Sequence, residues 1–200
     1  MTAIAIIPAR GGSQRIPHKN IKPFFGKPIL EYAVESARES GVFERIIVST
    51  DDADIAGVAI NCGAELHTRS DDLSKNEVGT QAVMASVLKD LIIMDSMNAG
   101  YACCLYATNP MVEPVEFIQA HGHLKFNAYL NYVVPVAEWL KDPGRWYFGR
   151  TQAFLSGLPL LGSGTRLYPI DPKRAVDINT DTDWEEAERK YLDLHEEAQA

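Results

Sequence analysis

The chain has few cysteines, no long apolar run and no excess of positive charge, and each absence excludes a class of protein. The three cysteines among its 200 residues are Cys62, Cys103 and Cys104. They show no C-x-x-C spacing, which argues against a disulfide framework, a cysteine zinc site and thioredoxin-like redox chemistry. No stretch of 18 apolar residues is present, so no membrane-spanning helix is expected. The formal net charge of −8 argues against nucleic acid or an anionic membrane as the main partner.

The two common phosphate-binding signatures are also missing. The chain contains no G-x-x-x-x-G-K-[ST] sequence, and Gly11 and Gly12 do not form a G-x-G-x-x-G fingerprint. The N-terminus lacks the charged and apolar regions of a secretory signal, and the cysteines suit buried thiols in a reducing compartment, so we expect a cytoplasmic protein. With 46% apolar residues, the chain is expected to form one domain, residues 1–200.

The most informative stretch that the chain does contain is IAIIPARGGSQRIPHKN, residues 4–20. Its first four residues form an apolar, mostly β-branched run, typical of a strand that is buried on both faces. Two glycines follow, and Arg10, Arg15, Lys19 and Lys22 lie close to them. Glycines allow backbone N–H groups to approach phosphate oxygens, and the cations offset the phosphate charge. The stretch therefore predicts a polyphosphate-binding loop; the alternative for such a basic loop is a solvated surface turn.

The rest of the chain alternates between predicted strands and predicted helices. The spacing predicts strands over 45–48, 64–68 and 101–107, and helices over 27–41, 55–62, 81–93 and 114–126. The second half is less regular, with strands expected over 129–136, 145–148, 166–170 and 175–178, a short helix over 151–155 and a final helix over 182–195. Alternation of this kind predicts a mostly parallel sheet, which binds its ligand beyond the carboxyl ends of the strands. The polar clusters at 9–15, 49–52, 69–80 and 106–110 are expected to lie there.

The stretch at residues 4–20 resembles the nucleotide-binding signature of the sugar-acid cytidylyltransferases. These enzymes make CMP-activated nonulosonic acids, such as sialic and pseudaminic acid. The resemblance implies an α/β fold, namely a single-domain, Rossmann-like, three-layer α/β/α nucleotidyltransferase with a mostly parallel sheet. It also implies transfer of CMP from CTP to a nonulosonic sugar acid, with release of pyrophosphate, for cell-surface glycan synthesis.

Three further runs resemble the pseudaminic acid branch of that family. They are YATNP at 106–110, DPGRWYFG at 142–149 and DINTDTDW at 177–184. The matches favour pseudaminic acid as the acceptor, and a sialic-acid or other sugar-acid cytidylyltransferase is the alternative within the family.

The resemblance also implies a set of site residues. Arg10, Arg15, Lys19 and Asp177 would carry the chemistry, and Mg²⁺ (or Mn²⁺) would be held by Asp177 and Asn179. The residues expected to bind the nucleotide are Ala9, Arg10, Gly11, Gly12, Ser13, Asn20, Arg69, Thr80 and Thr108. Two of them have ordinary structural alternatives. Arg69 could form a surface ion pair with Asp71 or Asp72, and Thr80 could cap a helix.

The chain departs from the family pattern at three places. Gln14 stands where relatives often have lysine, and Asn179 stands where they have aspartate. The region 128–176 is irregular and is a few dozen residues shorter than in relatives. In the family, the missing segment carries sugar-acid contacts and reaches the partner subunit. A homodimer is therefore an open alternative. So is a degenerate relative that binds nucleotide with little or no catalysis.

Other candidate residues receive structural interpretations. His121 and His123 have the side chains of a metal site but fall near the end of an amphipathic helix, so we interpret them as surface residues. Trp139, Trp146 and Tyr147 are interpreted as core or pocket wall.

Overall fold

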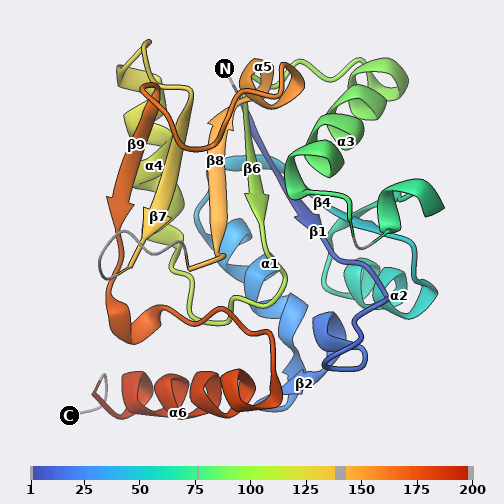
Figure 1. Ribbon diagram of the computed structural model, residues 1–200, viewed down its shortest axis with the longest axis vertical. Helices are drawn as coiled ribbons and strands as arrows, with labels where there is room; N and C mark the ends of the chain where they lie inside the picture. The colour runs from blue at the N-terminus through green and yellow to red at the C-terminus, as the bar shows by residue number, and fades with distance from the viewer. Residues whose placement is uncertain (1, 76, 138–142, 198–200) are drawn as a thin grey trace.

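The computed structural model describes residues 2–75, 77–137 and 143–197, and its main element is a seven-stranded sheet (Figure 1). The strands are β1 (Ala3–Pro8), β4 (Phe43–Thr50), β5 (Glu65–Thr68), β6 (Tyr101–Leu105), β7 (Tyr132–Val136), β8 (Trp146–Arg150) and β9 (Thr165–Pro169). Their order in the sheet is β5-β4-β1-β6-β8-β7-β9. Only β8 runs antiparallel to its neighbours among these strands, so the prediction of a mostly parallel sheet is confirmed.

Helices cover both faces of this sheet. They are α1 (Ile29–Glu39), α2 (Ala53–Asn61), α3 (Thr80–Asp95), α4 (Pro114–Phe126), α5 (Thr151–Leu155) and α6 (Asp181–Glu197), with a small hairpin of β2 (Pro23–Phe24) and β3 (Lys27–Pro28) before α1. Helices α1, α2 and α4 pack on one face, and α3 and α5 pack on the other. The predicted three-layer α/β/α class is thus confirmed.

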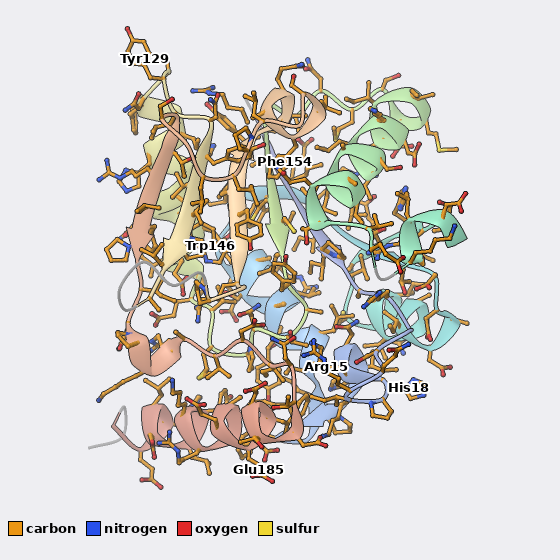
Figure 2. The ribbon with its side chains drawn as sticks, viewed as in Figure 1. Arg15, His18, Tyr129, Trp146, Phe154 and Glu185 are labelled. Atoms are coloured by element: carbon orange, nitrogen blue, oxygen red, sulfur yellow. The ribbon has the colours of Figure 1, made fainter. Side chains whose placement is uncertain are left out.

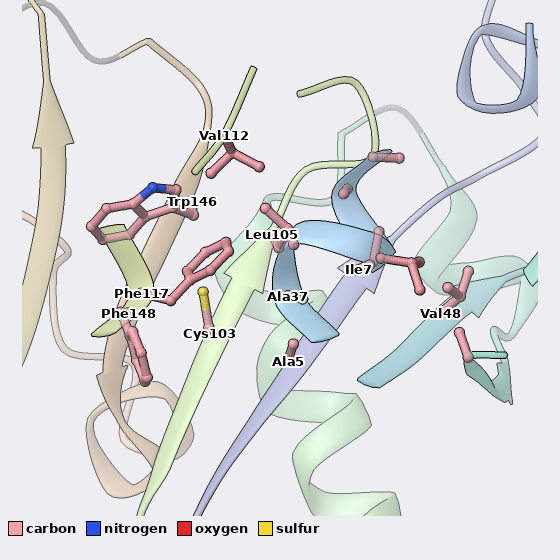
Figure 3. Packing of buried hydrophobic residues seen from close by; sticks show 14 of the residues in the cluster. Ala5, Ile7, Ala37, Val48, Cys103, Leu105, Val112, Phe117, Trp146 and Phe148 are labelled. Atoms are coloured by element: carbon pink, nitrogen blue, oxygen red, sulfur yellow. The ribbon is translucent and has the colours of Figure 1, made fainter. Parts of the chain in front are cut away.

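The alternation of side chains along the central strands explains the two apolar layers. Ala5 and Ile7 of β1 point to the face covered by α1, whereas Ile4 and Ile6 point to the face covered by α3. All four are at most 1% exposed. Figure 3 shows the first of these layers, where Ala5 and Ile7 lie near Cys103 and Leu105 of β6. A strand buried on both faces needs a continuous apolar run, which is why the sequence at this position could be interpreted without knowing its neighbours.

The C-terminal helix α6 lies at the end of the molecule toward which β1, β6, β7 and β9 point (Figure 1). Trp184 of α6 packs against Phe24 of β2, with ring centroids 5.6 Å apart, and both belong to a third apolar cluster with Ile178. This cluster brings the start of α6 and the residues before it close to the loop that follows β1. Two distant parts of the sequence therefore meet at the carboxyl end of the sheet.

Several predictions for the second half need correction. The segment 175–178 is not a strand: the carbonyls of Ala175 and Ile178 accept from lysine side chains, and none of the described strands pairs with this segment. Strand β7 begins at Tyr132 and not at residue 129, and Tyr129 is 91% exposed (Figure 2). His121 is not a simple surface residue, since its ring stacks on Phe148 and its buried Nε2 atom has no hydrogen-bond partner among the described residues.

The remaining predictions of core residues are divided. Trp146 and Tyr147 are buried, as expected, whereas Trp139 lies outside the described residues. Within the described ranges, no helix combines the length and the apolar character that crossing a bilayer requires.

Candidate active site

A cavity of about 510 Å³ opens where the carboxyl ends of β1 and β6 meet the loop after β5. Its walls come from segments far apart in the sequence. The lining residues are Pro8, Arg10, Ser13, Gln14, Arg15, Lys19, Asn20, Arg69, Leu73, Lys75, Val78, Thr80, Val83, Tyr106, Ala107, Thr108 and Asn179. The position matches the prediction that ligands bind beyond the carboxyl ends of parallel strands.

Five cationic side chains line this cavity. They are Arg10, Arg15, Lys19, Arg69 and Lys75, and none of the described lining residues is acidic. The whole chain carries a formal net charge of −8, so the positive charge is concentrated locally. Such a concentration attracts an anion with several charges, and it favours the polyphosphate interpretation of the basic loop over a solvated surface turn.

The loop after β1 is held in shape by contacts of its own backbone. The Asn20 Nδ2 atom donates to the Arg10 carbonyl at 2.9 Å, and the Gly11 N–H donates to Asp51 Oδ1 at 3.0 Å. A Cβ atom at Gly11 would lie 2.3 Å from Asp52 Oδ2, so only glycine fits there. Gly11 thus serves close packing against Asp52.

Of the residues predicted to bind nucleotide through this loop, only some face the cavity. Ser13 and Asn20 line it, whereas Ala9, Gly11 and Gly12 are not among the lining residues. Ala9 is fully buried, and its N–H donates to Ser49 O at 3.0 Å. Some of the predicted residues therefore line the cavity, and the others belong to the loop without facing the cavity.

Lys19 and Arg15 join the basic loop to the segment before α6. Lys19 Nζ donates to the Ile178 carbonyl at 2.6 Å, and Arg15 Nη2 donates to Asn179 Oδ1 at 3.1 Å. Figure 2 shows Arg15 above the start of α6, between the loop and the C-terminal segment. Burial lowers the pKa of Lys19, and the nearby Asp177 carboxylate opposes that effect. Lys19 is thus close enough to Asp177 for their charges to interact.

Asp177 and Asn179, the predicted metal ligands, face different spaces. Asn179 lines the main cavity, whereas Asp177 lines a neighbouring cavity of about 220 Å³ together with Val176 and Lys190. Gly144 packs against Asp177, with φ of +60°, and a Cβ atom there would approach its carboxyl carbon to 3.2 Å. The described residues contain no group of three His, Cys, Asp or Glu side chains placed to hold a metal ion.

Arg69 is a buried cavity residue, and it forms no ion pair with the side chains that the structure describes. Its side chain is 5% exposed, and its Nη2 atom donates to the Ser49 carbonyl at 3.0 Å. Asp72 instead pairs with Lys75, with 2.7 Å between Oδ1 and Nζ. Burial lowers the pKa of Arg69, which nevertheless stays cationic because an arginine begins from a very high value.

Two hydroxyl groups meet in the wall of the cavity. Thr80 Oγ1 and Tyr106 Oη are 2.7 Å apart, and Thr108 is buried beside them in the cavity wall. Thr80 is the first residue of α3 and Gly79 holds the N-cap position, so Thr80 is not the cap of this helix. Thr80 and Thr108 thus both line the cavity.

Sequence reasoning missed Lys75 and Tyr106 as lining residues. Lys75 lies in a polar stretch without periodicity, and the sequence carries no signal for its orientation. Tyr106 ends a predicted strand and belongs to the YATNP run, so its position at a strand end was a usable signal. Gln14 also lines the cavity, which places an uncharged side chain where the family often has lysine.

Comparisons with known proteins agree with this geometry. A family model described as "Cytidylyltransferase" matches residues 4–142. The chain is 32% identical to the pseudaminic acid cytidylyltransferase of Campylobacter jejuni subsp. jejuni serotype O:2, over 99% of this chain and 100% of that protein. It is 29% identical to N-acylneuraminate cytidylyltransferase A of Danio rerio, over 94% of this chain and 50% of that protein.

A solved structure shares the fold at low sequence identity. It is that of CMP:2-keto-3-deoxy-manno-octonic acid synthetase complexed with CTP, with a TM-score of 0.73 and 15% identity, covering 98% of this chain and 100% of that one. The alignment with the Campylobacter protein spans 234 positions, although this chain has 200 residues. At least 34 of those positions therefore have no residue of this chain opposite them.

Proposed function

The chain belongs to the cytidylyltransferase family, and we propose that it transfers CMP from CTP to a nonulosonic sugar acid, with pseudaminic acid as the preferred acceptor. The observation that carries the proposal is the cavity with five cations and no described acidic lining residue. A nucleoside triphosphate is an anion that such a site suits. The proposal assigns the activity to residues 1–200 as one domain acting in the cytoplasm, which fits the three free thiols.

In this proposal the cations act on the triphosphate. The anomeric hydroxyl of the acceptor attacks the α-phosphorus of CTP in line and loses its proton to solvent; a new O–P bond forms, and the bond from the α-phosphorus to the bridging oxygen breaks to release pyrophosphate. Arg10, Arg15 and Lys19 stabilise the negative charge that develops on the leaving pyrophosphate. The protein forms no covalent bond, because positioning and electrostatic stabilisation suffice for this kind of transfer.

The remaining cavity residues position the nucleotide. Arg69, Thr80 and Thr108 line the same cavity and would hold the cytidine part. Asn20 fixes the carbonyl of Arg10 and so keeps that guanidinium at the cavity. The N–H of Gly11 would bind phosphate only after exchanging its present acceptor, Asp51.

Asp177 and Asn179 line neighbouring cavities, so a divalent cation would take its donors from one or both of them and from the substrate. Asp177 offers one carboxylate and Asn179 one amide oxygen, and Mg²⁺ commonly combines one or two carboxylates with phosphate oxygens and water. Bound there, Mg²⁺ (or Mn²⁺) would neutralise phosphate charge and lower the pKa of the acceptor hydroxyl. Lys19, which interacts with both the Ile178 carbonyl and the charge of Asp177, keeps this segment next to the basic loop.

A second candidate function is favoured by particular observations. The Asn179 oxygen already accepts a hydrogen bond from Arg15, Gln14 supplies no charge, and at least 34 positions of the Campylobacter protein lack counterparts. These features would suit a relative that binds CTP with little or no transfer.

One experiment separates the two candidates. Pyrophosphate release is measured with CTP, Mg²⁺ and a panel of pseudaminic, legionaminic and sialic acid, beside CTP binding by calorimetry. Release with pseudaminic acid above the others is expected. Binding without release on any acid would identify the degenerate relative, and absence of CTP binding would overturn the proposal for this cavity.

A further inference from the structure

A line of hydrogen-bonded side chains runs from helix α3 across β5 and β4 to Arg69. His67 Nε2 lies 3.1 Å from Asp90 Oδ2, and His67 Nδ1 lies 3.1 Å from Ser49 Oγ. Arg69 Nε then donates to the same Ser49 Oγ at 3.4 Å. The line therefore starts at the half-exposed Asp90 and ends at a cation of the cavity wall.

The sheet register places these groups on one face. Ser49 of β4 and His67 of β5 are register partners in a parallel ladder, so their side chains lie next to each other on the same face. Arg69 follows His67 by two residues and shares that face. Ile47, two residues before Ser49, packs among side chains of α3, which shows that α3 covers this side. Asp90 is thus supplied by the helix that covers the pair.

With a neutral imidazole at His67, the donors and acceptors along the line have one consistent arrangement. The Arg69 Nε–H can only donate, so Ser49 Oγ accepts it and directs its single proton to His67 Nδ1. The imidazole then carries its proton on Nε2 and donates it to the Asp90 carboxylate. Ser49 is fully buried and His67 is 12% exposed, so every member has a partner where water is scarce. The line has the residue types of a Ser-His-Asp triad, but a fully buried serine cannot attack a substrate.

We propose that His67 is a positioning residue, which together with Asp90 fixes the hydroxyl of Ser49 and thereby the guanidinium of Arg69. Ser49 holds Arg69 twice, because its carbonyl also accepts from Nη2 at 3.0 Å. The carbonyl alone leaves the guanidinium free to rotate about that contact, whereas the second bond to the hydroxyl fixes its plane. The consequence for CTP affinity rests on the proposed function; the consequence for Arg69 itself does not.

Matched variants test the line. H67F removes both ring nitrogens, whereas H67Q keeps one acceptor and one donor and should restore the line. D90A removes the outer end. D95A is its control, because Asp95 lies on the same helix, has a side chain 44% exposed against 46% for Asp90, and binds Arg45 of β4 at 2.8 Å without touching the line.

The first measurement is solvent exchange of the Arg69 Nε–H by ¹⁵N NMR of the ligand-free protein. Faster exchange is expected in H67F and D90A, with H67Q and D95A close to the wild type. The second measurement is CTP affinity and the KM-against-kcat split in pyrophosphate release. In H67F and D90A, loss of one hydrogen bond should weaken CTP binding and raise its KM about 3- to 10-fold, with kcat within about twofold.

Two results would overturn the inference. One is unchanged Nε–H exchange in H67F, and the other is an equal response of D95A and D90A. A wild-type protein that fails to bind CTP contradicts the proposed function instead, since the exchange measurement needs no ligand.

Discussion

The two sides of the cavity are built in different ways. On the proposed nucleotide side, residues 8–108 supply all but one of the described lining residues, from strand ends, the loops after them and the start of α3. On the other side, Asn179 alone among the described residues reaches the cavity, from a segment without regular secondary structure. The first side is positioned by the sheet. The second is positioned by cationic side chains that bind backbone carbonyls.

Those carbonyl contacts are spread along the segment that leads to Asn179. Arg145 donates to Arg174 O, Lys190 to Ala175 O at 2.9 Å, and Lys19 to Ile178 O at 2.6 Å. Each is a single side chain whose loss would release part of the segment, whereas a strand is held by many backbone bonds. The comparison teaches that single substitutions should disturb the proposed nucleotide side less than the proposed acceptor and metal side.

The largest expected effect is at the joint between the two sides. Arg145 is 1% exposed and contacts Glu116, Met111 O and Arg174 O, while Glu116 also accepts from Trp146 Nε1 at 2.8 Å. R145M would leave the buried Glu116 without its cation and should cost about 3–5 kcal/mol of unfolding free energy. Chemical denaturation measures the change.

R174M is the control for this prediction. Arg174 forms a partly exposed ion pair with Glu113 at 3.1 Å, whose loss should cost at most about 1 kcal/mol. If R145M were no more destabilising than R174M, the joint would not hold the two sides together.

The next effect concerns the cation shared by both sides. K19M removes a charge from the triphosphate side of the cavity and a donor to Ile178 O. A lost hydrogen bond to a charged group costs about 1.5–3 kcal/mol, so CTP affinity should fall about 10- to 150-fold by calorimetry. K27M is the control, because Lys27 pairs with Glu35 outside the cavity. Equal affinities of the two variants would contradict the role of Lys19.

The same side chain predicts a pH dependence. Burial lowers the pKa of Lys19, and a bound triphosphate favours its charged form. CTP should therefore bind most tightly below that pKa and lose affinity as the pH rises through it. The decrease should begin at a lower pH than for an ordinary lysine. The decrease should be absent in K19R, whose guanidinium stays charged. Calorimetry over the alkaline range measures both profiles. A K19R affinity that falls together with that of the wild type would contradict the assignment to Lys19.

A smaller effect, this time a gain in metal affinity, is expected at the proposed metal-binding residue Asn179. N179D would add a carboxylate where a neutral amide now lies, and a carboxylate oxygen can still accept from Arg15. A second formal charge should strengthen Mg²⁺ binding. The Mg²⁺ concentration needed for CTP binding should then fall about tenfold, or ~1.4 kcal/mol. Calorimetric CTP titrations over a series of Mg²⁺ concentrations measure it. D181N, a change in the exposed first turn of α6, is the control, and an unchanged Mg²⁺ requirement in N179D would argue against a metal at this segment.

The difference between the two sides also explains what the sequence could and could not predict. The strand before the basic loop was predictable because the apolar run Ile4–Ile7 is mostly β-branched and ends at a proline, which is typical of a strand buried on both faces. Lys19, Arg69 and Thr80 reach the cavity as the strand order requires. The segment at 175–178 was misjudged because its conformation depends on Lys19, more than 150 residues earlier, and no local pattern encodes such a contact. The pairing of Ser49 with His67 was missed for a similar reason, since it depends on the register between two strands.

The smallest expected effect is at the start of α6, where the less regular side becomes helical. Asp183 Oδ2 accepts from Asn179 N at 2.8 Å and from Thr180 N at 2.7 Å, while Thr180 Oγ1 accepts from Asp183 N. This reciprocal cap corrects the expectation from the sequence, which places the helix start at Thr182. D183A should cost about 1 kcal/mol and lower Tm by about 2–4 °C, whereas D193A should cost less, because it breaks only an exposed pair with Arg189.

The cap of α6 also predicts a dependence on pH. Burial acts to raise the pKa of Asp183, but the hydrogen bonds from Asn179 and Thr180 outweigh it and lower that pKa. A carboxyl whose pKa is lower in the folded state stabilises the fold above its unfolded pKa and loses that contribution as the pH falls through the folded value. The difference in Tm between wild type and D183A should thus be full at pH 7 and shrink in acid. A difference that stayed constant down to pH 3 would mean that the Asp183 carboxylate does not hold the Asn179 backbone, and the less regular side would then depend on its lysine and arginine contacts alone.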